Sequence, residues 1–196
     1  MKFRLFGTKI YVSFFFCALF TVMLATDRTG LILPTFFAVA VHEIGHLFAM
    51  WVLDCEPKQI RLIPSSVQIV SSFSKQYKND IIIAVAGPLV NYVLFFTLNF
   101  NYLAFKNETV LYYALLNLII AVFNSLPVKG LDGGTVLYSV LAKRGDSNKA
   151  TLTVKLITVI TALLVIISAV LLTVKGKCNL SFYIIGIYLF IMGLIK

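Results

Sequence analysis

Two histidines and a glutamate lie within an apolar stretch, and this combination limits what the chain can become. The stretch covers residues 31–53 and contains the run HEIGH at positions 42–46. As a helix it is long enough to cross the hydrocarbon core of a bilayer, which is about 30 Å thick. A charged side chain at the centre of that core costs about 2.5–3.5 kcal/mol, so polar groups there are expected to serve a function.

The spacing of the two histidines fits a shared metal ion. His42 and His46 are four residues apart and therefore lie on one face of a helix, where both imidazoles can bind one ion. Glu43 follows His42 and would lie beside such an ion without being a ligand, as a catalytic acid/base does. Alternatively, one histidine fills a packing defect and the other faces a polar cavity, but this does not account for Glu43.

The composition indicates a membrane protein. The chain has 196 residues, of which 60% are hydrophobic and 13% charged, and its mean hydropathy is +0.94. A soluble domain of this composition could not cover its apolar surface, so we expect one compact polytopic membrane domain over residues 1–196. The net charge of +9 comes from basic residues between the apolar runs. This pattern argues against a nucleic-acid partner and favours topology signals and contacts with anionic lipid.

The cysteines do not form a recognisable framework. Cys17, Cys55 and Cys178 lie far apart, with no CxxC or Cys/His spacing. They are therefore expected to be unpaired structural thiols, with no disulfide and no zinc knuckle.

Six apolar runs predict six membrane helices in an all-α polytopic fold. The runs cover residues 10–26, 31–53, 81–103, 109–123, 152–174 and 180–195. The first follows a short basic segment, a pattern that signal peptides share. Its Met-Leu-Ala sequence is a poor cleavage site and more spans follow, so we expect a retained helix. A short surface helix is expected at 131–142.

Two segments in the middle of the chain depart from regular apolar helix. Residues 60–73 carry β-branched and apolar side chains around Pro64-Ser65-Ser66, which predicts a short β-hairpin, either dipping toward the membrane or on the surface. The third span contains Gly-Pro at 87–88, which loosens the helix and allows close approach by a neighbour. Asn91 in the same span then needs a polar partner within the bundle.

The fourth span cannot continue as a helix beyond residue 123. The following sequence, NSLPVKGLDGG at 124–134, contains a proline and three glycines. Unwound backbone at membrane depth marks binding sites in transporters. Asp132 is then able to turn back as a carboxylate ligand. The alternative is a connecting turn with a solvated Asp132.

The distribution of basic residues predicts the topology. With the N-terminus inside and six spans, the outer segments hold only Arg28, Lys106, Lys175 and Lys177 of the 17 Lys and Arg residues. This bias predicts a cell-membrane protein with both termini in the cytoplasm. The HEIGH run and the break after the fourth span then both lie near the cytosolic side, as a shared metal site requires.

Three of these segments together resemble the signatures of the site-2 protease family of intramembrane zinc metalloproteases. They are HEIGH at 42–46, AGPLVN at 86–91 and NSLPVKGLDGG at 124–134. The resemblance covers residues 31–134 and implies a three-helix metalloprotease core binding one Zn²⁺. The implied ligands are His42, His46 and Asp132, with Glu43 as the catalytic acid/base. Asn124, and more weakly Asn91, are implied to position substrate or stabilise the oxyanion.

The resemblance also implies what the protein acts on. Members of the family cleave single-span or membrane-associated proteins and can be controlled by a regulatory membrane protein. Six spans without a PDZ insertion resemble the small sporulation-type (stage IV FB) members, which process a pro-sigma factor at the cytosolic side. Pro-sigma or anti-sigma factor processing is therefore an expected role. Those members usually carry a C-terminal CBS domain, and no such domain is expected up to Lys196.

Two other functions are compatible with part of the pattern. A membrane metal transporter also places His and Asp within spans, but it has no use for a Glu beside the first ligand. An inactive protease-like scaffold would not need all the residues that carry the chemistry, yet this sequence has every one of them. For an active protease, we expect the hairpin at 60–73 to pair with the unwound substrate as an added strand.

Overall fold

The computed structural model describes residues 2–5, 8–55, 57–63, 66–71, 76–176 and 180–194. The chain divides into two compact units, Met1–Val122 and Phe123–Lys196. The described residues form four strands and seven helices. Of the cysteines, Cys17 and Cys55 are free thiols, as expected, and Cys178 lies outside the described residues.

The helices of the first unit correspond to the first four predicted spans, with differences at their ends. They are α1 (Phe14–Thr26), α2 (Ile32–Val52), α3 (Tyr77–Phe105) and α4 (Glu108–Asn124), which ends at the border between the units. The apolar side chains on their outer faces are exposed, for example Phe96 and Phe100 at 65% and 73%. Exposed aromatic side chains along a helix are expected where the helix faces lipid.

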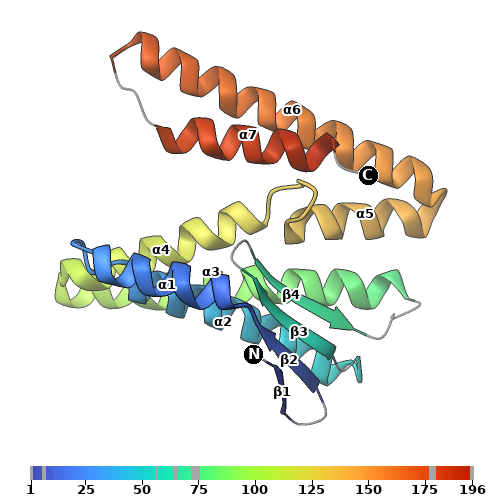
Figure 1. The fold of residues 1–196 in the computed structure, drawn as a ribbon, viewed down its shortest axis with the longest axis horizontal. Coiled ribbons are helices and arrows are strands. Elements are labelled where there is room, and N and C mark those ends of the chain that lie inside the picture. Colours follow the sequence, from blue (N-terminus) through green and yellow to red (C-terminus); the bar gives the residue numbers. More distant parts are fainter. Residues whose placement is uncertain are drawn as a thin grey trace. The chain divides into compact units, whose positions relative to one another are not determined.

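The helices of the second unit also match the prediction. They are α5 (Asp132–Arg144), α6 (Ser147–Val174) and α7 (Leu180–Leu194). Figure 1 shows α6 and α7 running side by side in orange and red. Their contact depends on small residues, because a Cβ on Gly186 would meet the side chain of Ile166, and one on Gly193 would meet Val159.

These helices confirm the predicted fold class. Three of them, α2, α3 and α6, are long and apolar enough to cross a membrane, and α1, α4 and α7 are shorter apolar helices. The protein is therefore a polytopic, mainly helical membrane protein. The expected surface helix at 131–142 corresponds to α5.

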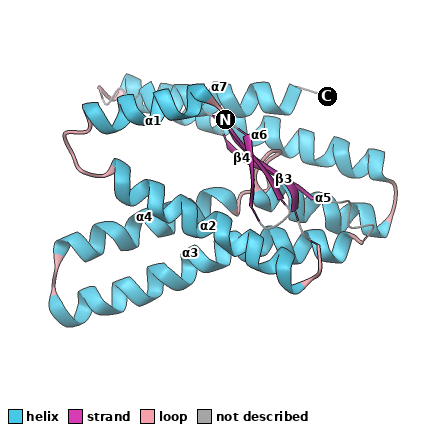
Figure 2. Ribbon diagram, turned by 60° about the horizontal axis from the view of Figure 1, so that its bottom comes forward, coloured by secondary structure: helices cyan, strands magenta, loops and turns pink. Residues whose placement is uncertain are grey.

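The structure contains a four-stranded sheet, with two strands before α1 and two after α2 in the sequence. The two strands before α1 are not predicted from the sequence. The order of the sheet is β1 (Lys2–Leu5), β2 (Thr8–Val12), β3 (Pro57–Ile63) and β4 (Ser66–Ser71). Figure 2 shows these strands in magenta. The predicted hairpin is present as the antiparallel pair β3–β4, although positions 64–65 and 72–73 lie outside the described residues.

The first predicted span begins too early. Residues 10–12 belong to β2, which pairs in parallel with β3 so that Ile10 faces Ile60, and α1 starts only at Phe14. The physical reason is a partner that lies far away in the sequence. Ile, Tyr and Val suit an apolar helix as well as a strand, and pairing with β3 decides between the two.

A capped turn joins α1 to α2. The Asp27 carboxylate accepts hydrogen bonds from the N–H groups of Ile32, Gly30 and Thr29 and from the Thr29 hydroxyl. The Ile32 N–H, followed by the Thr29 hydroxyl, lowers the pKa of Asp27 below its ordinary value. Gly30 takes the positive φ of 68° that this tight turn requires.

The predicted break after α4 is confirmed by the irregular backbone up to Leu131. Gly130 has a φ of +89°, a value that L-residues rarely adopt. A Cβ on Gly134 would overlap the carbonyl of Val128, so the backbone doubles back on itself here. The Thr158 hydroxyl of α6 accepts from the Lys129 N–H at 2.8 Å and donates to the Val154 carbonyl at 2.7 Å. The irregular segment is thereby fixed to the helices of its own unit.

Candidate metal centre

The buried face of α2 carries both histidines. His42 and His46 are 4% and 7% exposed, whereas Ile44 and Phe48 on the other side of the helix are 58% and 62% exposed. The four-residue spacing places the two imidazoles one above the other, as the sequence predicts. Helix α3 packs along this face, and it comes close because Gly45 leaves room for the Ala86 carbonyl.

The hydrogen bonds of the two rings fix which nitrogen carries the proton. His46 Nδ1 lies 2.7 Å from the carbonyl oxygen of Ile83, which can only accept, so the ring carries its proton on Nδ1. His42 Nδ1 lies 2.7 Å from Asn91 Oδ1. The Asn91 amide donates through Nδ2 to the backbone carbonyl of Ala38 and to the side-chain oxygen Oδ1 of Asn117, so its own oxygen faces His42 and accepts.

Two imidazole lone pairs therefore point toward one another. The Nε2 atoms of His42 and His46 are 3.1 Å apart. With both protons held on Nδ1, the facing lone pairs repel, and a cation bound between them removes this repulsion. Two ligands about 2.0–2.1 Å from a tetrahedral zinc would be separated by about 3.3 Å, which agrees with the observed distance. The donor set thus fits a zinc ion.

Gly87 of α3 keeps the space between the rings open. A Cβ built on this residue would overlap Nε2 and Cε1 of His46 and would lie 2.9 Å from Nε2 of His42. Only a residue without a side chain fits at this point. The expectation that Gly-Pro allows a close approach is confirmed, and the approaching neighbours are the two imidazoles.

The structure places Glu43 and Asn91 differently relative to this pair. Glu43 is half-buried on α2, about 100° around the helix from His42. Asn91 is fully buried on α3 and contacts His42 directly. Its amide is held on three sides by the groups described above. The structure thus brings His42, His46 and Asn91 into one cluster.

Two predicted site residues come from the segment around the helix break. Asn124 is the last residue of α4, and Asp132 is the first residue of α5. Both are half-buried and belong to the second unit. Their roles as substrate-positioning amide and metal ligand stay predictions.

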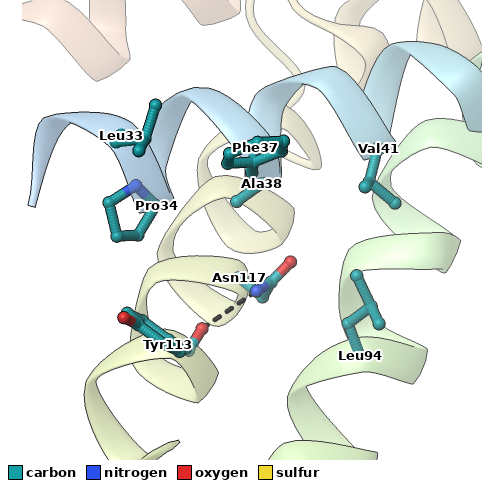
Figure 3. A pocket seen from close by; sticks show the side chains of 8 residues that line it. All are labelled: Leu33, Pro34, Phe37, Ala38, Val41, Leu94, Tyr113 and Asn117. Atoms are coloured by element: carbon teal, nitrogen blue, oxygen red, sulfur yellow. Dashed lines mark hydrogen bonds between the residues drawn. The ribbon is translucent and has the colours of Figure 1, made fainter. Parts of the chain in front are cut away.

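An apolar cavity of about 350 Å³ lies next to the buried amides within the first unit. Figure 3 shows its lining, in which the Asn117 amide is held by the Tyr113 carbonyl. The cavity is lined by Leu33, Pro34, Phe37, Ala38, Val41, Leu94, Tyr113 and Asn117. The Asn117 amide at its edge is thus already bonded to a backbone carbonyl.

Comparison with known proteins agrees with this geometry. The sequence model of peptidase family M50 matches residues 104–168. A zinc metalloprotease of Methanocaldococcus jannaschii is 30% identical over 127 residues, and stage IV sporulation protein FB of Bacillus subtilis is 26% identical over 146 residues. The solved site-2 protease from M. jannaschii has a TM-score of 0.70 at 21% identity, covering 98% of this chain and 93% of that one. The chain thus resembles peptidase family M50 in part of its sequence and has the fold of a site-2 protease.

The sequence matches to this family are partial. The matched segments cover 59% and 72% of this chain. They correspond to 35% of the archaeal zinc metalloprotease and 51% of the sporulation protein, so the chain spans about half or less of these relatives' length. The solved site-2 protease, at its low identity, establishes the fold.

One member of the cluster was missed in the sequence. Asn117 lies in α4 and is 5% exposed. The available signal was a lone amide in the apolar run 109–123, because a buried amide in a membrane helix requires a partner. The carbonyl of Ile83, which holds His46, carries no sequence signal, since every residue has one.

Proposed function

We propose that this chain is an intramembrane zinc metalloendopeptidase that cleaves a transmembrane or membrane-associated protein. The observation that supports this most strongly is the pair of buried imidazoles with their Nε2 atoms 3.1 Å apart and a glutamate beside the first of them. The partial matches to peptidase family M50 and to an archaeal zinc metalloprotease support the same activity.

We assign the zinc ligands and the catalytic acid/base as the sequence predicts. His42 and His46 bind through Nε2, and the Asp132 carboxylate is the third ligand. Zinc, when bound, polarises the scissile carbonyl and activates water. Glu43 accepts a proton from the attacking water and returns it to the nitrogen of the leaving amine. The Asn124 amide donates to the carbonyl oxygen as it becomes negative.

We infer the cellular setting from the positive-inside pattern and from the relatives. Both termini lie in the cytoplasm, and cleavage takes place near the cytosolic side of the membrane. The match to a stage IV sporulation protein supports a pro-sigma factor, or an anti-sigma factor, as the kind of substrate. A regulatory membrane protein would control access to the site.

The proposed activity is tested by following zinc and cleavage together. Purified chain in lipid vesicles, supplied with candidate single-span proteins, is expected to release a cleaved fragment. Chelation should abolish the cleavage and added zinc should restore it, because the side-chain ligands hold the ion reversibly. Asp132→Asn should lower zinc content and cleavage together. Chelator-insensitive cleavage, or zinc flux across the vesicles without cleavage of any candidate, would overturn the proposal.

The free edge of β4 offers a place for the unwound substrate. Within the described sheet, β4 is an edge strand, and an extended peptide can add to such an edge by main-chain hydrogen bonds. Consecutive N–H groups of a strand point to opposite edges. We therefore compare Gln68→Pro with Ile69→Pro. One of the two removes a backbone N–H that points away from β3, which a sheet edge tolerates, and is called the outward substitution. The other removes an N–H that bonds β3 and is called the inward substitution.

We expect the outward substitution to slow cleavage several-fold with unchanged zinc content. The measurement is the rate of fragment release beside zinc analysis of the same sample. The inward substitution serves as the control for damage to the sheet, recognised by a lower melting temperature. Wild-type cleavage rates in both variants would exclude strand addition at this edge.

A further inference from the structure

The buried amides of α3 and α4 form a chain of hydrogen bonds that ends on a proposed zinc ligand. The Tyr113 carbonyl accepts from Asn117 Nδ2 at 2.9 Å, and Asn117 Oδ1 accepts from Asn91 Nδ2 at 2.8 Å. Asn91 Oδ1 then accepts from His42 Nδ1 at 2.7 Å. We propose that Asn91 and Asn117 are positioning residues that hold His42 in its Nδ1–H form and so present Nε2 to the metal.

The direction of this chain is set by two backbone carbonyls, that of Tyr113 at its start and that of Ala38 beside Asn91. The Tyr113 carbonyl can only accept, so Asn117 must turn its NH₂ group toward it and its oxygen toward Asn91. Asn91 in turn donates to Asn117 and to the Ala38 carbonyl, which lies 3.1 Å from Nδ2. A flipped Asn91 would bring its oxygen against two other acceptors in a buried place. Asn91 therefore always presents its side-chain oxygen, a hydrogen-bond acceptor, to His42 Nδ1.

The direction of these hydrogen bonds matters because His42 has a competing tautomer. Which nitrogen of a neutral imidazole carries the proton is set by the hydrogen bond that the other nitrogen makes. Without the amide acceptor, His42 can carry its proton on Nε2 and donate it to Nε2 of His46, only 3.1 Å away. That bond would occupy both ligand atoms. The amide chain thus keeps the two histidines from bonding to one another.

His42 and His46 differ in what holds them. His46 is oriented by the Ile83 carbonyl, which no substitution removes. His42 is oriented by side chains from two other helices, and Asn117 is buried at 5% exposure without contacting either ring. An effect of Asn117 on zinc binding must therefore pass through Asn91 and His42. This inference rests on the proposed zinc site but says nothing of the substrate.

The sequence allows a direct measurement, because the chain contains only two histidines. With ¹⁵N-labelled histidine and a purification tag free of histidine, the spectrum of the full chain contains only two rings. Spectra are recorded with and without zinc at about pH 8.5, where unperturbed histidine is neutral. The wild type should show the Nδ1–H form for both rings before zinc is added.

Asn91→Leu and Asn117→Leu should each move His42 toward the Nε2–H form and leave His46 unchanged. Zinc affinity should fall about 10- to 100-fold in Asn91→Leu, as for other partners of metal-bound histidines, and less in Asn117→Leu. The double variant should be no weaker than Asn91→Leu alone, because both act through one contact. Asn117→Asp should keep the wild-type form, since a carboxyl at this position still offers an oxygen that accepts from Asn91 Nδ2.

Asn101→Leu is the matched control, because Asn101 lies on α3, is exposed, and bonds the Thr97 carbonyl four residues back as Asn117 bonds Tyr113. It should change neither the His42 signal nor zinc affinity. An unchanged His42 signal in both Asn91→Leu and Asn117→Leu, with folded protein by melting temperature, would overturn the inference. The ¹⁵N spectra give the proton positions without any substrate. A failure of the proposed peptidase activity would therefore be distinguished from a failure of this inference.

Discussion

Replacing Gly87 by alanine is expected to abolish zinc binding and with it all cleavage. The added methyl group would overlap His46 and come within 2.9 Å of Nε2 of His42, in the space between the two ligand atoms. Neither ring can retreat easily, because each is held through Nδ1 by a bond of 2.7 Å. The measurement is zinc content per chain after purification, together with fragment release from a cleaved substrate.

A loss of folding would give the same result, so the variant must be compared without metal. The metal-free Gly87→Ala variant should still unfold cooperatively, at a melting temperature lowered only by the overpacking, while the rise that zinc produces in the wild type should vanish. Gly145→Ala is the control, because nothing lies within 4 Å of a Cβ at that position. Full zinc content in Gly87→Ala would show that the metal does not lie between these imidazoles.

Replacing Glu43 by glutamine is expected to remove cleavage while zinc stays bound. The amide has nearly the shape of the carboxylate but cannot accept and return a proton, and such general acid–base catalysis contributes about 10²–10⁴-fold to a rate. Glu43 is half-buried beside His42 and is not a proposed ligand, so zinc affinity should change little. Co-expression with single-span membrane proteins should show a fragment with the wild type and none with the variant.

Glu108→Gln provides the matched control, since Glu108 is an exposed carboxylate in the first turn of α4. It should cleave at the wild-type rate. Cleavage at the wild-type rate by Glu43→Gln would exclude Glu43 as the acid/base. Zinc movement across vesicles that is equal in the wild type and Glu43→Gln, without proteolysis, would instead favour a metal transporter.

The sequence predicts most of the helices and the histidine pair of the metal cluster, because the patterns that indicate them are local. Helix periodicity is local, so the spacing of His42 and His46 determines that both rings share a face. Apolar length is also local, and the ends of α2 differ from the predicted span by one residue at each end. The hairpin at β3–β4 is likewise formed by neighbours in the chain.

What the sequence does not reveal depends on distant partners. Segment 10–12 reads as helix until β3 is available to pair with it. The role of Asn117 depends on meeting Asn91, which lies 26 residues earlier. The hydrogen bond from His46 to the Ile83 carbonyl is set by how α3 packs on α2, and no residue type encodes it.

The parallel pairing of β2 with β3 has a consequence for biosynthesis. The N-terminal strands leave the ribosome first, whereas β3 begins about 45 residues after β2 ends, beyond α1 and α2. At translation rates of about 5–20 residues per second, β2 waits roughly two to nine seconds for its neighbour. During that interval its main-chain groups have no sheet partner on that side, while two apolar helices are entering the bilayer. The sheet can therefore be completed only after α1 and α2 have both left the ribosome.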